Sequence, residues 1–271
     1  MNILLSIITA LVGFNLLIEP LIEGSLIYFP SKEIVATPKD AGMEYEDIYL
    51  TTSDNVRINL WHIGHQDSRK IVLFFHGNGA NMSYLLPVME YFHEMPAASC
   101  FVDYRGYGLS GGKPTEKKLY ADARQVYRYL IDEKHYKPQD IILWGWSLGA
   151  SVAIDLAVDH EVGGIIVHSG MTSVKDMSGR VLTPILKPFV WVRSKFDNLA
   201  KLPKLKCPTL FIYSKTDSII PYKMGVRNFE AANTPKHLIT LADNTHEDFE
   251  FGAADDKTIR DFILKQNLPA Q

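Results

Sequence analysis

The chain has 271 residues, of which 46% are hydrophobic and 11% aromatic, which suits one large domain with a sizeable core and excludes a disordered polymer. The net charge of −3 at pH 7 offers no general attraction for nucleic acid, so we expect no nucleic-acid partner. The two cysteines, Cys100 and Cys207, stand on separate apolar runs, and no Cys/His spacing typical of zinc occurs. We therefore expect two buried thiols and no metal site.

The first element along the chain is an apolar segment, residues 3–18, which has no charged residue and ends before Glu19 and Pro20. As a helix it would reach about 24 Å, slightly less than the roughly 30 Å of a bilayer's hydrocarbon core. We predict a membrane anchor within residues 1–25 and hence a membrane-associated location. A cleaved signal peptide and a helix packed on its own domain or on a partner are the alternatives. No Lys or Arg precedes the segment, so charge does not orient it.

After residue 30 the sequence alternates between strand and helix patterns. An antiparallel pair is expected at residues 45–51 and 56–63, around a Ser-Asp-Asn turn. Continuous apolar runs predict strands buried on both faces, and amphipathic segments between them predict helices. The expected strands are 71–75, 98–103, 141–146, 165–168, 209–213 and 238–241, and the expected helices are 83–95, 117–134, 148–158, 223–232 and 257–265. This alternation predicts an α/β fold with a mostly parallel sheet and helices on both faces.

Residues 171–206 interrupt the alternation with several prolines and no clear strand. Ordinary connections between a strand and a helix have 2–6 residues, so we expect a small cap inserted over one end of the sheet. From 175 to 206 the stretch carries eight basic and two acidic residues, with aromatic residues among them. That pattern suits a surface resting on anionic lipid, and equally a solvated cap with an apolar underside over the pocket.

Chemically capable side chains follow several expected strands, at the edge where open parallel sheets form their active sites. Ser147 comes directly after one strand, within the G-x-S-x-G of "GWSLG", Asp217 follows a later strand, and His246 follows the last. This order of Ser, Asp and His is that of the α/β-hydrolase triad. We predict Ser147 as nucleophile, His246 as general base and then general acid, and Asp217 as the acceptor that orients the imidazole.

Two backbone amides complete the predicted site. The N–H of Leu148, at the start of the helix after the nucleophile, and the N–H of Asn78, in the loop after strand 71–75, would form an oxyanion hole. Gly145 and Gly149 would let the strand and the helix approach closely at the turn. These expectations place the oxyanion donors on two different loops.

Other titratable residues beside these strands are weaker candidates. Asp243 and Asp248 are the runner-up acids. We expect His76 to support the loop of the oxyanion hole. His168 ends a strand at the correct edge, where it would line the pocket or, more simply, be a satisfied core histidine.

The chain resembles α/β-hydrolase-fold serine esterases, in particular the small membrane-anchored α/β-hydrolase-domain proteins that include protein depalmitoylases. The resemblance spans most of residues 26–250 and is carried by "LIYFPSK", "FFHGNGAN", "DYRGYGLSGGKPTE", "GWSLGAS", "CPTLFIYSKTDSIIP" and "NTHEDF". It implies an α/β-hydrolase domain over residues 26–271, with an eight-stranded type of sheet and a cap at about 171–206. It also implies Ser147, Asp217 and His246 as the triad. Two departures, "YSKTD" and "SGMTS", flank the pocket, so the resemblance speaks more for mechanism than for substrate.

The residues and the resemblance together predict a membrane-associated serine hydrolase. We expect it to cleave carboxylic ester or thioester bonds of small-molecule, lipid or other acyl substrates through an acyl-enzyme, without cofactor or metal. A serine peptidase of the same fold is one alternative, because the same groups can attack amides. A catalytically silent adaptor built on this fold is the other.

Overall fold

A single eight-stranded sheet organises the computed structural model, which describes residues 24–66, 68–181 and 193–269. The strand order is β10-β9-β8-β7-β4-β6-β3-β2. β2 (Glu46–Thr51) and β3 (Arg57–Ile63) pair antiparallel, and β3 also pairs antiparallel with β6. The six strands that run parallel to one another are β4 (Ile71–Phe75), β6 (Ala98–Val102), β7 (Ile141–Trp146), β8 (Gly164–His168), β9 (Thr209–Ser214) and β10 (Lys236–Leu241). The predicted mostly parallel sheet is confirmed.

The central strands are buried on both faces. Every residue of β4, β6, β7, β8 and β9 is buried, which explains why these strands read as continuous apolar runs rather than as alternating patterns. In the edge strand β2, by contrast, every residue keeps some exposure. The apolar runs thus mark the middle of the sheet, where the predicted nucleophile stands.

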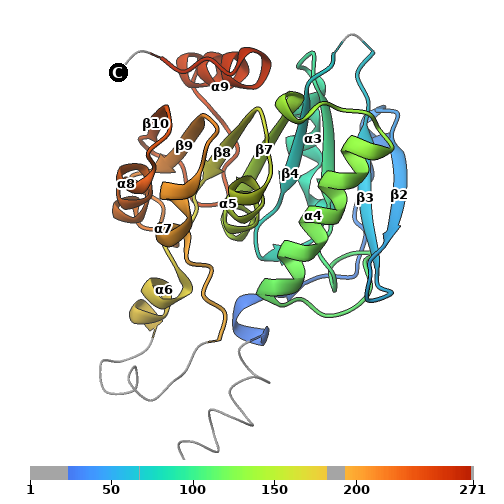
Figure 1. The fold of residues 1–271 in the computed structure, drawn as a ribbon, viewed down its shortest axis with the longest axis horizontal. Coiled ribbons are helices and arrows are strands. Elements are labelled where there is room, and N and C mark those ends of the chain that lie inside the picture. The colour runs from blue at the N-terminus through green and yellow to red at the C-terminus, as the bar shows by residue number, and fades with distance from the viewer. Residues whose placement is uncertain (1–23, 67, 182–192, 270–271) are drawn as a thin grey trace, which may run out of the picture.

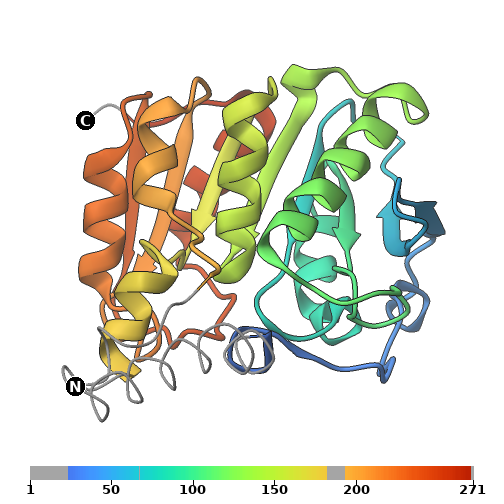
Figure 2. The same cartoon turned by 60° about the horizontal axis from the view of Figure 1, so that its bottom comes forward.

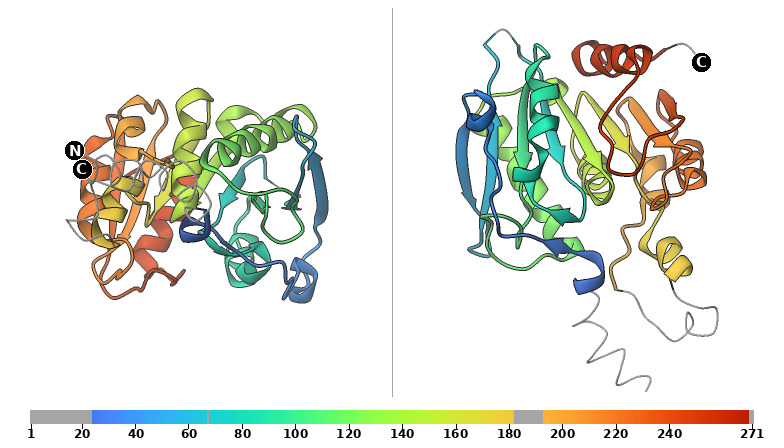
Figure 3. Two further views of the ribbon diagram at one scale, coloured as in Figure 1. Left: turned by 90° about the horizontal axis from the view of Figure 1, so that it is seen from below. Right: turned by 180° about the vertical axis from the view of Figure 1, so that it is seen from behind.

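Helices cover both faces of this sheet (Figure 1). On one face lie α4 (Glu116–Asp132), α5 (Leu148–Asp159) and α8 (Tyr222–Ala231), which Figure 2 shows in front of the strands. On the other face lie α3 (Leu86–His93) and α9 (Ala253–Lys265), as the left view of Figure 3 shows. Each helix buries its apolar stripe against the sheet, so two separate cores form, one on each side.

Several short elements lie outside the predicted pattern. β1 (Phe29–Pro30) and β5 (Gly79–Ala80) form a second, two-stranded sheet. The helix expected at 83–95 is divided into η3 (Met82–Leu85) and α3, because Pro87 stands in the first turn of α3, where its missing N–H costs no hydrogen bond. Two further 3-10 turns are η2 (Pro38–Ala41) and η4 (Pro138–Asp140).

The stretch expected as a cap contains α6 (Val174–Val181), α7 (Asn198–Lys201) and η6 (Leu202–Lys204), while residues 182–192 lie outside the described part of the chain. Figure 1 shows α6 beyond the same end of the sheet as residues 24–30. The buried ring of Phe196 packs edge-on against Tyr28 and Tyr120, with ring centroids 6.5 and 5.8 Å away. The cap as a separate unit stays a prediction.

The expected membrane-associated location needs correction. Among residues 24–66, 68–181 and 193–269, no helix has both the length and the apolar character needed to cross a membrane. The expectation rested on residues 3–18, which lie outside the described residues. On this finding, membrane anchoring is not supported.

Candidate active site

Ser147 stands on a sharp turn between β7 and α5. Its backbone angles are φ 56° and ψ −113°, a region that residues with a side chain rarely adopt. The turn is held on one side by the bond from the Ser147 N–H to the His168 carbonyl, at 2.8 Å. On the other side a Cβ on Gly149 would lie only 1.9 Å from the Phe75 carbonyl oxygen. The strained serine is therefore maintained by close backbone packing that tolerates no side chain at residue 149.

The structure brings the three predicted side chains together from distant parts of the chain. The Ser147 Oγ lies 3.0 Å from His246 Nε2, and His246 Nδ1 lies 2.7 Å from Asp217 Oδ2. With Nδ1 protonated, the imidazole donates to the carboxylate and its Nε2 accepts from the serine hydroxyl. The arrangement can therefore pass a proton from the hydroxyl to the imidazole.

Asp217 is held ionised by its surroundings. Its Oδ1 accepts hydrogen bonds from the N–H groups of Ile219 and Ile220, both at 2.8 Å, while Oδ2 faces His246. Burial raises the pKa of Asp217, but the bond to His246, the charge of His246 and the two backbone donors outweigh it, so the pKa lies below its usual value. A buried carboxylate that stays charged can stabilise an imidazolium beside it.

The runner-up acids take other positions. Asp248 accepts a hydrogen bond from the Thr245 N–H at 2.6 Å, so it stabilises the loop that carries His246 and does not orient the imidazole. Asp243 is exposed. The structure thus brings Asp217, and neither of the other two, into contact with the imidazole.

The two predicted oxyanion donors belong to segments that lie next to Ser147. Leu148 is the first residue of α5, directly after Ser147. The loop of Asn78 passes beside Ser147, since a Cβ on Gly77 would lie 3.7 Å from the Ser147 Cβ. Within the described part of the chain, no hydrogen bond uses the backbone N–H of Asn78 or Leu148. Both amides are therefore free to bind a ligand atom.

His76 fixes one of these amides through a peptide plane. Its Nδ1 donates to the Gly77 carbonyl at 2.7 Å, and its buried Nε2 lies 3.4 Å from the Asp103 carboxylate. In a trans peptide the Gly77 C=O and the Asn78 N–H point in opposite directions. Holding the carbonyl therefore sets the direction of the Asn78 N–H.

An aromatic cluster lies under the loop of His246. The ring of His168 stacks on Trp146 at a centroid distance of 5.3 Å and an angle of 6°. Phe249, three residues beyond His246, packs against both rings and against Trp144. Burial, reinforced by the charge of His246, lowers the pKa of His168 to about 3, so this ring is neutral. Sequence reasoning missed Phe249, although an aromatic residue so close after the histidine was the available signal.

Metal ligation has no support in the described residues. Within residues 24–66, 68–181 and 193–269, no group of three or more His, Cys, Asp or Glu side chains could hold a metal ion. Cys100 and Cys207 are both buried free thiols, and burial raises the pKa of Cys207 to about 12.

Comparison with known proteins gives three kinds of match. A family model described as "Serine aminopeptidase, S33" matches residues 66–199. The protein bem46 of Schizosaccharomyces pombe is 31% identical over 91% of this chain and 87% of its own length, and the human alpha/beta hydrolase domain-containing protein 17B is 29% identical over 74% and 68%. Among solved structures, the esterase Pf2001 of Pyrococcus furiosus is 27% identical, with a TM-score of 0.69 over 81% of this chain and 91% of that one.

Proposed function

The chain belongs to the α/β-hydrolase-domain family, and on that premise we propose that it is a serine hydrolase that cleaves carboxylic ester or thioester bonds through an acyl-enzyme. The observation that carries the proposal is the continuous contact from Ser147 Oγ to His246 Nε2 and from His246 Nδ1 to Asp217. A serine hydroxyl is a weak nucleophile until a base takes its proton, and this contact supplies the base.

In the first half of the reaction, Ser147 Oγ attacks the carbonyl carbon while His246 Nε2 takes the hydroxyl proton. The carbonyl oxygen becomes an oxyanion and accepts hydrogen bonds from the N–H groups of Asn78 and Leu148. Asp217 stabilises the imidazolium that forms. The tetrahedral intermediate then collapses, its bond to the leaving oxygen or sulfur breaks, and Nε2–H returns the proton to that atom. An alcohol or thiol departs, and the acyl group stays on Ser147.

In the second half, His246 takes a proton from water as the water oxygen attacks the acyl carbon. A second oxyanion forms in the same place, and its collapse expels Ser147 Oγ, which recovers the proton from Nε2. The carboxylic acid leaves and the enzyme is restored. Each oxyanion donor of this kind typically contributes about 2.7–4 kcal/mol to the transition state.

The bond that is cleaved is the finer part of the proposal. The similarity to a solved esterase favours esters, and the resemblance to depalmitoylase-type proteins extends the proposal to acyl thioesters. The match to a family described as a serine aminopeptidase supports an amide substrate as the second candidate. Esters and thioesters have better leaving groups than amides, so the same groups would cleave them faster.

Labelling by a fluorophosphonate, which phosphonylates an activated serine, tests the proposal. We expect the wild-type protein to be labelled and the Ser147→Ala variant to be unlabelled although folded. Rates on a p-nitrophenyl ester series, an acyl thioester and an aminoacyl anilide then separate the substrate classes. Faster anilide cleavage would favour the peptidase, and a folded wild-type protein that is neither labelled nor active would refute the hydrolase.

A further inference from the structure

Residues 27–35, here called the N-terminal strap, run beside the loop that carries Asn78. β1 of the strap pairs in parallel with β5 of that loop. The Phe29 N–H donates to the Asn78 carbonyl and the Ser31 N–H donates to the Ala80 carbonyl, both at 2.9 Å. A pair of two-residue strands is too short to be stable alone, so other bonds must hold it in place.

Side chains of the loop after β4 supply these bonds. The described contacts run from Asn78 Nδ2 to the Ile27 carbonyl (3.1 Å), from Asn81 Nδ2 to the carbonyls of Ser31 (3.1 Å) and Glu33 (2.7 Å), and from the Val35 N–H to Ser83 Oγ (3.0 Å). Asn81 is buried, so its two bonds are shielded from competing water. The strap and the loop thus form one hydrogen-bonded unit.

A third segment, the loop after β6, forms hydrogen bonds with both the strap and the loop of Asn78. The buried Tyr107 donates its hydroxyl to the Asn78 carbonyl at 2.8 Å. The Gly108 N–H donates to the Ser31 carbonyl at 2.9 Å, and Lys32 Nζ donates to the Ser110 carbonyl at 2.6 Å. The Asn78 carbonyl therefore accepts two hydrogen bonds, one from the strap and one from Tyr107.

Asn78 is consequently held at its carbonyl oxygen and at its side-chain nitrogen. His76 sets the peptide plane before it, the strap and Tyr107 hold its carbonyl, and the strap holds its side chain. Its backbone N–H, which the proposed mechanism uses, makes no hydrogen bond within the described part of the chain. Such donors accelerate a reaction because they need no reorganisation when the charge develops, and a displacement of about 1 Å can cost on the order of 10²-fold in rate.

We propose that the N-terminal strap, with Tyr107, positions the oxyanion hole and so controls turnover rather than substrate binding. This inference rests on the proposed serine hydrolase function. Phe29 and Tyr107 act here as positioning residues through Asn78. A segment nearly fifty residues upstream of the loop thus takes part in catalysis.

Two variants test the positioning. Tyr107→Phe keeps the ring and removes only the hydroxyl. Phe29→Pro removes the strap's N–H donor to the Asn78 carbonyl, together with the Phe29 ring, which is exposed. We expect each to lower kcat for an ester about 2- to 10-fold with KM nearly unchanged, because the lost bond acts on the transition state. The double variant leaves the carbonyl without either donor, and we expect a loss of about 10²-fold, as for a missing oxyanion donor.

Tyr127→Phe is the matched control. The Tyr127 hydroxyl donates to the Glu161 carbonyl at 2.7 Å, a bond of the same kind between residues of α4 and the loop after α5. We expect a similar loss of thermal stability from Tyr127→Phe but an unchanged kcat. A trifluoromethyl ketone, which becomes an oxyanion when Ser147 adds to it, should bind Tyr107→Phe more weakly in proportion to kcat/KM.

Each result has a definite meaning. Equal kcat values and equal ketone affinities in Tyr107→Phe and Tyr127→Phe, beside an active wild type, would overturn the inference and leave the hydrolase function standing. A wild type that cleaves no ester and takes no fluorophosphonate would overturn both. Tyr107→Phe decides the matter where Phe29→Pro does not fold.

Discussion

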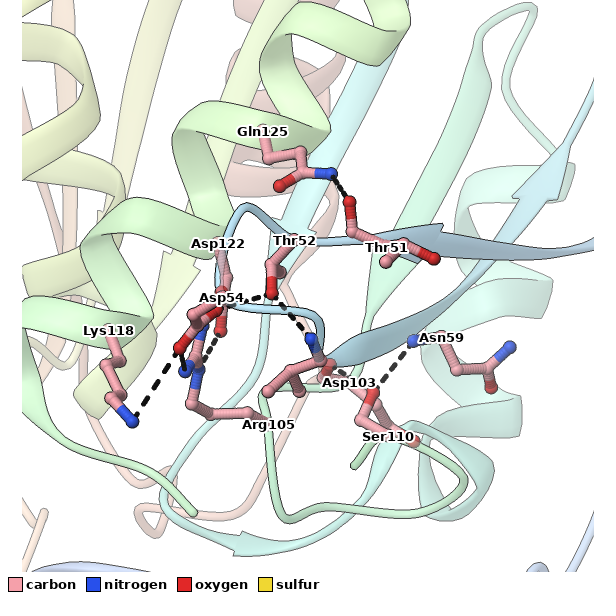
Figure 4. A network of polar contacts seen from close by, with 11 residues as sticks. Thr51, Thr52, Asp54, Asn59, Asp103, Arg105, Ser110, Lys118, Asp122 and Gln125 are labelled. Carbon is pink, nitrogen blue, oxygen red and sulfur yellow. Dashed lines mark hydrogen bonds and ion pairs between the residues drawn. The ribbon is translucent and has the colours of Figure 1, made fainter. Parts of the chain in front are cut away.

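Replacing Arg105 by methionine should destabilise the fold by about 3–5 kcal/mol, because it leaves the carboxylate of Asp122 buried without its partner. Arg105 and Asp122 are only 1% and 2% exposed. The guanidinium donates through Nε to Asp122 Oδ2 at 2.7 Å and through a terminal nitrogen to Oδ1 at 2.5 Å, and it also reaches Asp54 at 2.8 Å (Figure 4).

The expected loss of stability comes mainly from the buried carboxylate of Asp122. Asp54 has an exposed carboxylate, so solvent screens its bond to Arg105 and that bond adds little to stability. Burial raises the pKa of Asp122, and the hydrogen bond and charge of Arg105 offset only part of that rise. Without Arg105 the pKa rises further above its unfolded value. A carboxyl with a raised folded pKa loses stability as pH rises, so the deficit of Arg105→Met should shrink toward acid pH.

Urea unfolding measures the loss in free energy of unfolding, and thermal unfolding measures the corresponding fall in melting temperature. At neutral pH we expect the melting temperature of Arg105→Met to fall by roughly 6–20 °C, and we expect Asp122→Leu in the same chain to restore much of it. Arg124→Met is the control, since the Arg124–Asp155 pair has the same 2.7 Å distance but a more exposed guanidinium. A loss below about 1 kcal/mol in Arg105→Met, or no recovery in the double variant, would refute the reasoning.

Two further predictions concern the turn of the nucleophile and the ring beneath it. Burial lowers the pKa of His168 to about 3, so the unfolded chain binds a proton on this ring more tightly than the folded chain does. The free energy of unfolding should therefore fall as pH drops below roughly 6.5, by up to about 1.4 kcal/mol per pH unit. His168→Phe should flatten that slope in urea unfolding between about pH 7 and pH 4.5, and identical slopes would contradict the account. Gly149→Ala should cost about 1–3 kcal/mol or more and abolish fluorophosphonate labelling, because its Cβ would meet the Phe75 carbonyl oxygen. Gly252→Ala, where a Cβ meets nothing within 4 Å, should keep full labelling, and a labelled, equally stable Gly149→Ala would count against the close-packing argument.

The candidate site was predictable from the sequence because its side chains follow recognisable strands. Continuous apolar runs mark the strands before Ser147 and Asp217, and parallel strands bring the loops at their carboxyl ends to one edge. The sequence order of the strands does not contain their spatial order, so only the structure shows how β7, β9 and β10 bring the three side chains within hydrogen-bond distance.

The strap and the buried arginine were not predictable for a different reason. β1 has two residues, too few to show a period, and its partners are backbone groups about fifty residues away. Arg105 lies in a glycine-rich loop and reads as an exposed polar residue, since its burial depends on Asp122 in α4 and on Asp54 in a separate turn. Local sequence patterns do not indicate such long-range pairs.

The strand order also gives the three side chains of the candidate triad different resistance to local unfolding. The proposed nucleophile follows β7 in the interior of the sheet, whereas the proposed acid and base follow β9 and the edge strand β10. Proteins open in cooperative subunits, and peripheral ones open at a lower free energy than the centre. When β10 frays from β9, the imidazole leaves the hydroxyl while the middle of the sheet stays intact. Warming should therefore produce a population that has lost its activity before it has lost its near-native spectrum.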